Sequence, residues 1–281
     1  MPRMFIFGLG YTARVIATRL EARGWEVIST GSEGTLSFDD EGSVRLALAD
    51  ADHVLSSVPP GNEGRGEPLD PVLDRYGDAI ATLSLSYLSS TGVYGDTGGA
   101  WVDESAPTGT GRRTARSDAD AEWLARGAKV WRLPGIYGPG RSMLERVREG
   151  RAHRIDLPAQ VFSRIHVEDI AAGVIAGLRA PPGAYNLADD LPCGQNVLVE
   201  EACRLLGLRP PPLLSLEEAD LSPMARGFYA ENRRVANGKA RRVLGWQPRY
   251  PDYAAGLRAL SATLSPAIAS TAPATASSDH R

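Results

Sequence analysis

The fold is decided near the start of the chain by residues 3–29, which read RMFIFGLGYTARVIATRLEARGWEVIS. Residues 3–7 form a short, mostly apolar run, as expected of a strand buried on both faces of a parallel sheet. After a glycine-containing turn, Ile16 and Leu20 lie four positions apart, which indicates one face of a helix that stops at Gly24. A second strand pattern follows. Strand, turn, helix and strand in this order predict a right-handed βαβ unit.

Strand and helix patterns continue to alternate beyond this unit. Further strands are expected at 35–38, 53–58, 85–89, 129–133 and 184–187. Further helices are expected at 41–49, 72–83, 118–126, 167–178 and 197–206. This alternation predicts an α/β fold with a doubly wound parallel sheet.

Composition and charge exclude several classes of protein. A 281-residue chain with 43% hydrophobic and 23% charged residues is typical of a soluble globular protein. The net charge of −3 gives no reason to expect a nucleic acid or a membrane as partner, and no apolar run approaches the ~20 residues of a membrane helix.

Without a signal-peptide pattern we expect a cytoplasmic protein, with Cys193 and Cys203 as reduced thiols. The four histidines share no metal-ligand spacing, so no metal site is expected.

The turn after the first strand carries a G-x-G-x-x-A pattern, formed by Gly8, Gly10 and Ala13. Gly8 permits the tight turn, Gly10 lets a pyrophosphate approach the backbone, and Ala13 lets the helix pack close to the strand. Between a strand and a helix this pattern predicts a dinucleotide site at the helix N-terminus. The alternative is a structural turn without a ligand.

The choice of dinucleotide depends on the end of the second strand. A carboxylate there would bind the ribose 2′-hydroxyl of NAD, but residues 29–32 read Ser-Thr-Gly-Ser. Because Arg14 could bind a 2′-phosphate, NADP is favoured over NAD; the alternative for Arg14 is a solvated helix cation. The cofactor contacts expected in this region are Gly8, Gly10, Tyr11, Thr12, Ala13, Arg14, Thr30 and Ser32.

Several later segments resemble the extended short-chain dehydrogenase/reductase family, of the NAD-dependent epimerase/dehydratase type. They are LSSTGVYG at 88–95, DESAP at 103–107, RLPGIYGPG at 132–140, RIHVEDIA at 164–171, YNLA at 185–188 and LGWQP at 244–248. The resemblance implies a Rossmann domain from 1–135 and 163–180 and a smaller C-terminal substrate lobe from 136–162 and 181–260. Residues 261–281, rich in Ala, Ser, Thr and Pro, predict a disordered tail.

The chain departs from the family at the catalytic pair. The family has a Tyr-x-x-x-Lys pair on the helix after the acidic-Pro segment, with a glutamate four residues after the lysine. Here Glu122 fits that glutamate, which puts Asp118 at the lysine position and Thr114 at the tyrosine position. No tyrosine occurs between Tyr94 and Tyr137. The pair is therefore absent, as in atypical branches that retain the fold and often the cofactor.

Other site residues follow from position in the family. Ser90 matches the catalytic Ser/Thr, and Tyr94 could supply a phenol, although packing of the loop is the favoured alternative for Tyr94. Arg113 could bind an anionic substrate or lie in a solvated loop, as could its neighbours Arg112 and Arg116. Further substrate contacts are expected at Arg141 and His166, the latter also a candidate helix cap. Further cofactor contacts are expected at Asp39, Ser57, Val58, Pro59, Ser90 and Pro134.

Two functions remain open from the sequence. The first is an NAD(P)-dependent oxidoreductase or epimerase-like enzyme with a non-standard active site, a small-molecule substrate and a monomeric or homodimeric state. The second is a non-catalytic NAD(P)(H)-binding redox sensor or regulator. The enzyme is favoured because cleft-lining segments, such as Ser90 and residues 137–139, are kept together with the fold.

Overall fold

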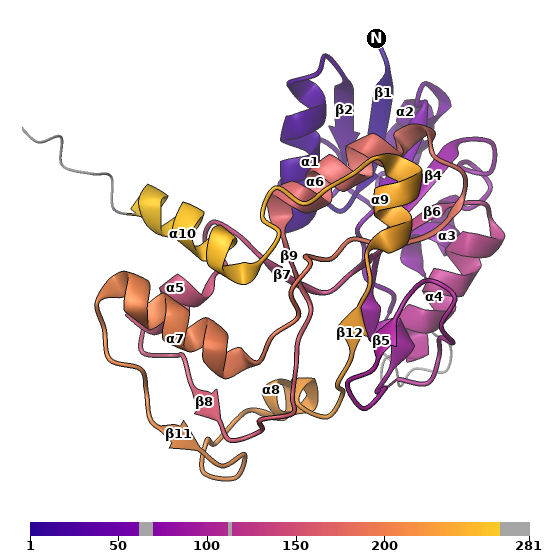
Figure 1. Ribbon diagram of the computed structural model, residues 1–281. Coiled ribbons are helices and arrows are strands. Elements are labelled where there is room, and N and C mark those ends of the chain that lie inside the picture. Colours follow the sequence, from indigo (N-terminus) through magenta and orange to yellow (C-terminus); the bar gives the residue numbers. More distant parts are fainter. Residues whose placement is uncertain (62–69, 112–113, 265–281) are drawn as a thin grey trace, which may run out of the picture.

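A six-stranded parallel sheet forms the centre of the computed structural model, which describes residues 1–61, 70–111 and 114–264 (Figure 1). The strand order is β10-β6-β4-β3-β1-β2, and all five pairings are parallel. The strands are β1 (Arg3–Phe7), β2 (Glu26–Ser29), β3 (His53–Ser56), β4 (Ser84–Ser90), β6 (Lys129–Leu133) and β10 (Gly183–Asn186). The predicted α/β fold with a Rossmann-type sheet is confirmed.

Helices cover both faces of this sheet. One face carries α1 (Tyr11–Glu21), α6 (Val167–Ala176) and α9 (Gly238–Leu244), and the other carries α2 (Glu41–Ala49), α3 (Pro71–Tyr76) and α4 (Thr114–Ala125) (Figure 1). On the first face Leu20 and Val174 share a core with Trp131 of β6. On the second face Val44 and Trp123 pack in a separate core. Burial of such side chains, at roughly 1.5–3 kcal/mol each, holds the three layers together.

A smaller lobe lies beside the sheet (Figure 1). Its helices α5 (Met143–Arg148), α7 (Gln195–Leu206) and α10 (Tyr253–Leu264) share a core that includes Leu144, Val199 and Leu257. Strand β8 (Arg154–Ile155) pairs with β11 (Leu213–Leu214), and α8 (Pro223–Phe228) follows. Two further pairs connect distant segments: β7 (Gly135–Tyr137) with β9 (Arg164–His166), and β5 (Trp101–Val102) with β12 (Arg234–Val235). Two short 3₁₀ helices, η1 (Thr91–Tyr94) and η2 (Gly177–Arg179), complete the described elements.

The structure corrects several expected boundaries. Strand β10 pairs with β6 in the main sheet, and α9 packs on the face of this sheet that carries α1 and α6. Both elements come from 181–260, the range that was assigned to the smaller lobe. The expected strand at 35–38 is reduced to a bridge between Thr30 and Leu36, and the expected helix at 72–83 ends at Tyr76. Helix α10 continues to Leu264, into the segment predicted as a tail, and 265–281 lie outside the described residues. None of the helices in the described ranges is long and apolar enough to cross a membrane.

Candidate functional site

The glycine turn is held by the ends of β2 and β3. Gly8 has a φ of +81°, and a Cβ there would lie 3.1 Å from both Ser57 Oγ and Val58 Cγ2. The Gly8 N–H donates to Thr30 Oγ1 at 3.2 Å, and the Ser57 hydroxyl donates to the Gly8 carbonyl. Because the conformation disfavours other residues and the space is filled, glycine is required at this position.

Gly10 is the N-cap residue of helix α1, and the first N–H groups of the helix have no side-chain cap. Gly10 has a φ of −82°, and a Cβ there would meet no atom within 4 Å. Tyr11, Thr12 and Ala13 follow and line a cavity. Unsatisfied N–H groups and the helix dipole make such a terminus a site for a negatively charged group.

The cavity has a volume of about 840 Å³ and lies where strands of the main sheet end. This is the edge at which doubly wound sheets bind their ligands. Of the residues proposed from the sequence, it brings together Gly10, Tyr11, Thr12, Ala13, Ser57, Ser90, Pro134 and Arg141.

Other proposed cofactor contacts do not line this cavity. They are Gly8, Arg14, Thr30, Ser32, Asp39, Val58 and Pro59. Gly8 and Thr30 shape the turn instead, and Asp39 pairs with Arg75. Arg14 forms an exposed ion pair with Glu33, with Nη1 and Oε2 2.8 Å apart. Arg113, like Arg112, lies outside the described residues.

The two proposed catalytic residues have different surroundings. Ser90 is half-buried and lines the cavity, and its Oγ accepts a hydrogen bond from Gly92 N at 3.1 Å. Tyr94 is 2% exposed; its hydroxyl donates to Asn186 Oδ1 at 2.8 Å and accepts from Arg132 Nη1 at 3.0 Å. Burial raises the pKa of Tyr94. The phenol is thus enclosed in a structural network, which corrects the hypothesis that Tyr94 is catalytic.

His166 also has a structural role. It is 2% exposed and caps α6, accepting from Glu168 N at Nδ1 over 3.2 Å. Its ring packs edge-on against Tyr137, with centroids 5.1 Å apart. Burial lowers the pKa of His166 to about 4, so the ring is neutral near neutral pH. The proposed substrate contact is corrected to the capping alternative.

Helix α4 does not bury the positions that the family spacing assigns to the catalytic pair. Thr114, Asp118 and Glu122 are exposed, and Glu122 pairs with Arg126. The buried acidic residue is Asp120, which is 1% exposed.

Asp120 connects α4 to two strands of the sheet. It accepts hydrogen bonds from Ser89 Oγ at 2.6 Å and from Arg132 Nη2 at 2.7 Å. One turn earlier on the same face, Arg116 lines the cavity and donates to the Tyr87 hydroxyl at 2.8 Å. A basic and an acidic residue four positions apart thus face β4 together.

The other wall of the cavity was not predicted from the sequence. It carries Arg146, His153, Phe162, Arg164, Phe228, Tyr229, Glu231 and Arg233. These residues come from loops and element ends scattered over the second half of the chain. Apart from Arg164, which begins the motif at 164–171, no local motif marks them, so only the tertiary structure could reveal that they share one space.

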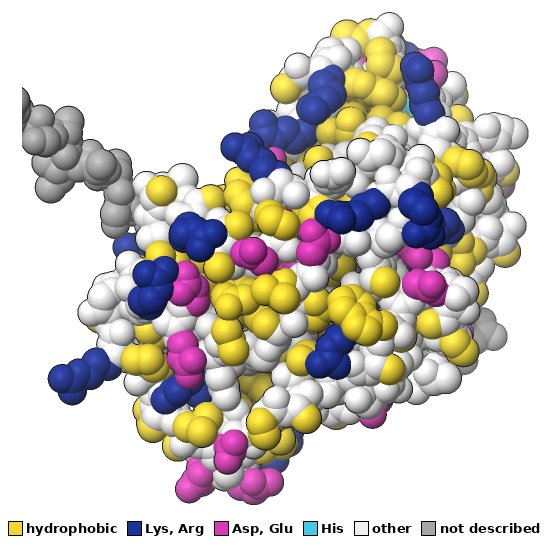
Figure 2. Space-filling model, viewed as in Figure 1, with side chains coloured by type: hydrophobic (Ala, Val, Ile, Leu, Met, Phe, Trp, Pro, Cys, Tyr) yellow, Lys and Arg dark blue, Asp and Glu magenta, His cyan; other side chains and the backbone are white. Residues whose placement is uncertain are grey.

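Positive charge is concentrated in this cavity. Its described lining holds five arginines but a single carboxylate, Glu231. Arg116, Arg141, Arg146 and Arg164 form no ion pair with any described residue. On the outer face in Figure 2, by contrast, cationic and anionic side chains are interspersed. A protein of net charge −3 therefore presents a strongly positive interior surface.

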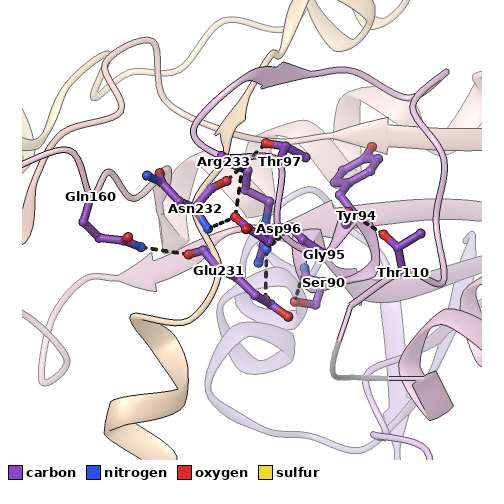
Figure 3. Close-up of polar contacts among 12 residues, drawn as sticks. Ser90, Tyr94, Gly95, Asp96, Thr97, Thr110, Gln160, Glu231, Asn232 and Arg233 are labelled. Carbon is purple, nitrogen blue, oxygen red and sulfur yellow. Dashed lines mark hydrogen bonds and ion pairs between the residues drawn. The ribbon is translucent and has the colours of Figure 1, made fainter.

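Hydrogen bonds and an ion pair hold the segment around Glu231 in position, as Figure 3 shows. Asn232 N donates to Asp96 Oδ1 at 2.8 Å, and Gln160 Nε2 donates to the Glu231 carbonyl at 2.8 Å. Arg233 Nη1 lies 2.9 Å from Glu231 Oε2 and also donates to the Gly95 carbonyl at 2.6 Å. Contacts from both sides fix the carboxylate, whose side chain is 8% exposed, inside the cavity.

Across the residues that the structure describes, no group of three or more His, Cys, Asp and Glu side chains could hold a metal ion. The site thus consists of a helix terminus, a serine, a clamped carboxylate and several guanidinium groups.

Comparisons with known proteins agree with this fold. No family model matches the chain. A conserved protein of unknown function from Silicibacter pomeroyi is 40% identical, with a TM-score of 0.81 over 94% of this chain and 99% of that chain. Protein YeeZ of Escherichia coli K12 is 28% identical over 90% of this chain and 97% of its own length. The human epimerase family protein SDR39U1, solved with NADPH, shares the fold at 19% identity, with a TM-score of 0.74 over 92% of this chain and 99% of that chain.

Proposed function

The chain belongs to the same family as the conserved Silicibacter pomeroyi protein, and we propose that it is an NAD(P)-dependent oxidoreductase or epimerase-like enzyme for a small anionic molecule. One observation carries the proposal. A single cavity joins the uncapped N-terminus of α1 to Ser90 and to five arginines. The helix terminus suits a pyrophosphate, and the remaining guanidinium groups suit a negatively charged substrate.

The turn fits a dinucleotide. Gly10 leaves open space beside the free N–H groups, where a pyrophosphate would lie, and Ser57 and Pro134 line the same cavity. When bound, the dinucleotide would supply or accept a hydride. For the 2′-phosphate of NADP, which we favour, Arg14 would be the ligand and would exchange its ion pair with Glu33 for the phosphate.

We place the family's lysine at Arg116 rather than at Asp118. The family spacing puts an acidic residue four positions after the lysine, and Arg116 with the buried Asp120 has this spacing on the sheet-facing side of α4. A guanidinium supplies a fixed positive charge that does not titrate near neutral pH. This placement restores no tyrosine, because four residues before Arg116 the chain has Arg112.

We assign proton exchange to Glu231. Ser90 orients a substrate oxygen, but a serine by itself is a weak acid and base near neutral pH. A Cβ on Gly111 would lie 3.2 Å from Glu231 Oε1 and 2.7 Å from the Gly92 carbonyl, so the carboxylate lies beside the turn that starts at Ser90. In Figure 3 the Glu231 side chain extends toward Ser90. Arg233 fixes its position.

A titration of NADPH tests the proposal. We expect the wild-type protein to bind NADPH, measured by nicotinamide fluorescence, and Gly10→Val to abolish binding while circular dichroism stays unchanged. The control is Gly42→Val, at the start of α2, where a Cβ also has room and does not line the cavity. Equal NADPH affinity in wild type and Gly10→Val would refute the dinucleotide site.

A further inference from the structure

Aromatic rings line the smaller-lobe wall of the cavity. Phe162 and Tyr229 meet edge to face, with centroids 5.6 Å apart and an interplanar angle of 89°. The His153 ring lies 6.5 Å from that of Tyr229. Phe228, 48% exposed, adds apolar surface to the same wall. Aromatic surface inside a concave pocket suits a flat aromatic or apolar ligand.

Two guanidinium groups adjoin these rings. Arg164 is 6% exposed, and its Nη1 donates to the carbonyls of Phe162 at 3.0 Å and Cys193 at 3.1 Å. Its Nη2 donates to Gln195 Oε1 at 3.0 Å. All these acceptors are neutral, and the Phe162 ring, whose centroid lies 5.8 Å from Arg164 Cζ, offers a cation–π contact but no counter-charge. A buried cation without a counter-charge is costly unless a ligand supplies one.

Arg146 is the second guanidinium group on this wall of the cavity. Its Nη2 donates to the neutral carbonyl of Arg151 at 3.2 Å. Burial raises the pKa of the Tyr229 hydroxyl, and the charges of Arg146 and Arg164 both oppose that rise. Both guanidinium groups are therefore close enough to Tyr229 to influence its hydroxyl. Both arginines line the cavity together with these rings.

The nearby acid does not neutralise Arg164. Asp189 follows β10, and its backbone N–H donates to the Arg164 carbonyl at 2.8 Å. Burial raises the pKa of Asp189 to about 8, so near neutral pH its carboxyl group is mostly protonated. The positive charge of Arg164 thus remains available to a bound anion.

We propose that this wall is a binding subsite for an aromatic carboxylate. The ring would pack against Phe162 and Tyr229, and the carboxylate would accept hydrogen bonds from Arg146 and Arg164. This inference rests on the proposed function, because it names the substrate class of the same cavity. An arginine can hold a carboxylate through two parallel hydrogen bonds, which gives both affinity and orientation.

Binding of three probes to the NADPH-loaded protein tests the inference by calorimetry at pH 7. Benzoate has ring and charge, acetate has charge alone, and benzamide has the ring alone. We expect benzoate to bind about tenfold or more tightly than either of the others, since each lacks one contact. Benzoate that binds no better than acetate or benzamide would overturn the subsite.

Arginine substitutions test where benzoate binds. Arg164→Gln and Arg146→Gln should each weaken benzoate binding about tenfold. Arg146 is exposed, so its substitution leaves folding intact even if Arg164→Gln does not. The matched control is Arg204→Gln, an exposed arginine outside the cavity that pairs with Glu201. Benzoate binding that Arg146→Gln leaves unchanged would refute the inference.

The experiment separates the two proposals. NADPH affinity is measured in every variant, and it should stay at the wild-type value. If NADPH fails to bind the wild-type protein, the proposed function fails; if NADPH binds and benzoate does not, only the aromatic subsite fails. A further arm uses uridine diphosphate. Binding of that nucleotide through the same two arginines, more tightly than benzoate, would overturn the assignment to an aromatic carboxylate.

Discussion

Replacing Asp189 with asparagine should change how the stability of this protein depends on pH. Asp189 is 1% exposed, and neither carboxyl oxygen has a hydrogen-bond partner. Burial raises its pKa from the ordinary 3.8 to about 8, although the charge of Arg164 opposes the shift. Between these values the folded chain retains a proton that the unfolded chain has lost, so stability falls as pH rises.

The window from pH 6.5 to 8 isolates this effect. The pKa of His166 is lowered by burial from 6.5 to about 4, so its contribution has the opposite sign: stability falls as pH drops below 6.5. Above 6.5 this histidine becomes neutral in the unfolded state too, and its remaining contribution is the same in the wild-type protein and in Asp189→Asn. A slope of about 1.4 kcal/mol per pH unit then gives a loss of about 2 kcal/mol across the window. The full rise in the pKa of Asp189 corresponds to about 6 kcal/mol.

Urea denaturation at several pH values measures this loss. The wild-type protein should lose about 2 kcal/mol of unfolding free energy between pH 6.5 and 8 relative to Asp189→Asn, because asparagine does not titrate. The control is Asp190→Asn, since Asp190 is partly exposed and paired with Arg241. Parallel curves for wild type and Asp189→Asn would refute the reasoning, as would a wild-type protein that gains stability over this window relative to the variant.

Three further results are expected. Asp120→Asn should lower the unfolding free energy by about 3–5 kcal/mol in urea, because Arg132 would stay buried without its counter-charge; a loss below about 1 kcal/mol would contradict this. Arg14→Gln should weaken NADPH binding by about three- to tenfold and leave NADH binding unchanged, whereas Glu33→Gln should strengthen NADPH binding; equal effects on both dinucleotides would exclude a 2′-phosphate contact. Phenylpyruvate is an aromatic carboxylate with a reducible carbonyl, so it tests the proposed subsite and the proposed reaction together. Glu231→Gln should keep NADPH affinity but lower NADPH oxidation with phenylpyruvate, followed at 340 nm, by about a hundredfold; unchanged turnover would remove Glu231 from proton exchange.

The sheet and the glycine turn could be predicted because their signals are local. A strand buried on both faces must be apolar, and a turn with a positive φ favours glycine, so residues 3–13 carry both signals. Helix α6 was predicted from its apolar spacing and packs against α1 in the same core. Boundaries were less predictable: the apolar pattern after Pro71 continues past Tyr76, but α3 ends there.

Side-chain direction was the main source of error. Tyr94 and His166 lie in motifs that resemble those of the family, yet both side chains are buried in structural contacts. On α4, a shift of two positions between Glu122 and Asp120 moves the acidic residue from solvent to the sheet. A helix turns about 100° per residue, so two positions along α4 reverse the face on which a side chain lies.

The sequence by itself determined the alternation of strands and helices that builds the main sheet, the glycine turn and the absence of a tyrosine between Tyr94 and Tyr137. These properties depend on local periodicity and residue identity. Only the tertiary structure decided that Arg164, Tyr229 and Glu231 share one cavity with Ser90. It also decided that Asp189 is buried deeply enough to raise its pKa. Both outcomes depend on contacts between distant segments, and a carboxyl or guanidinium group acquires its chemistry from the neighbours that those contacts supply.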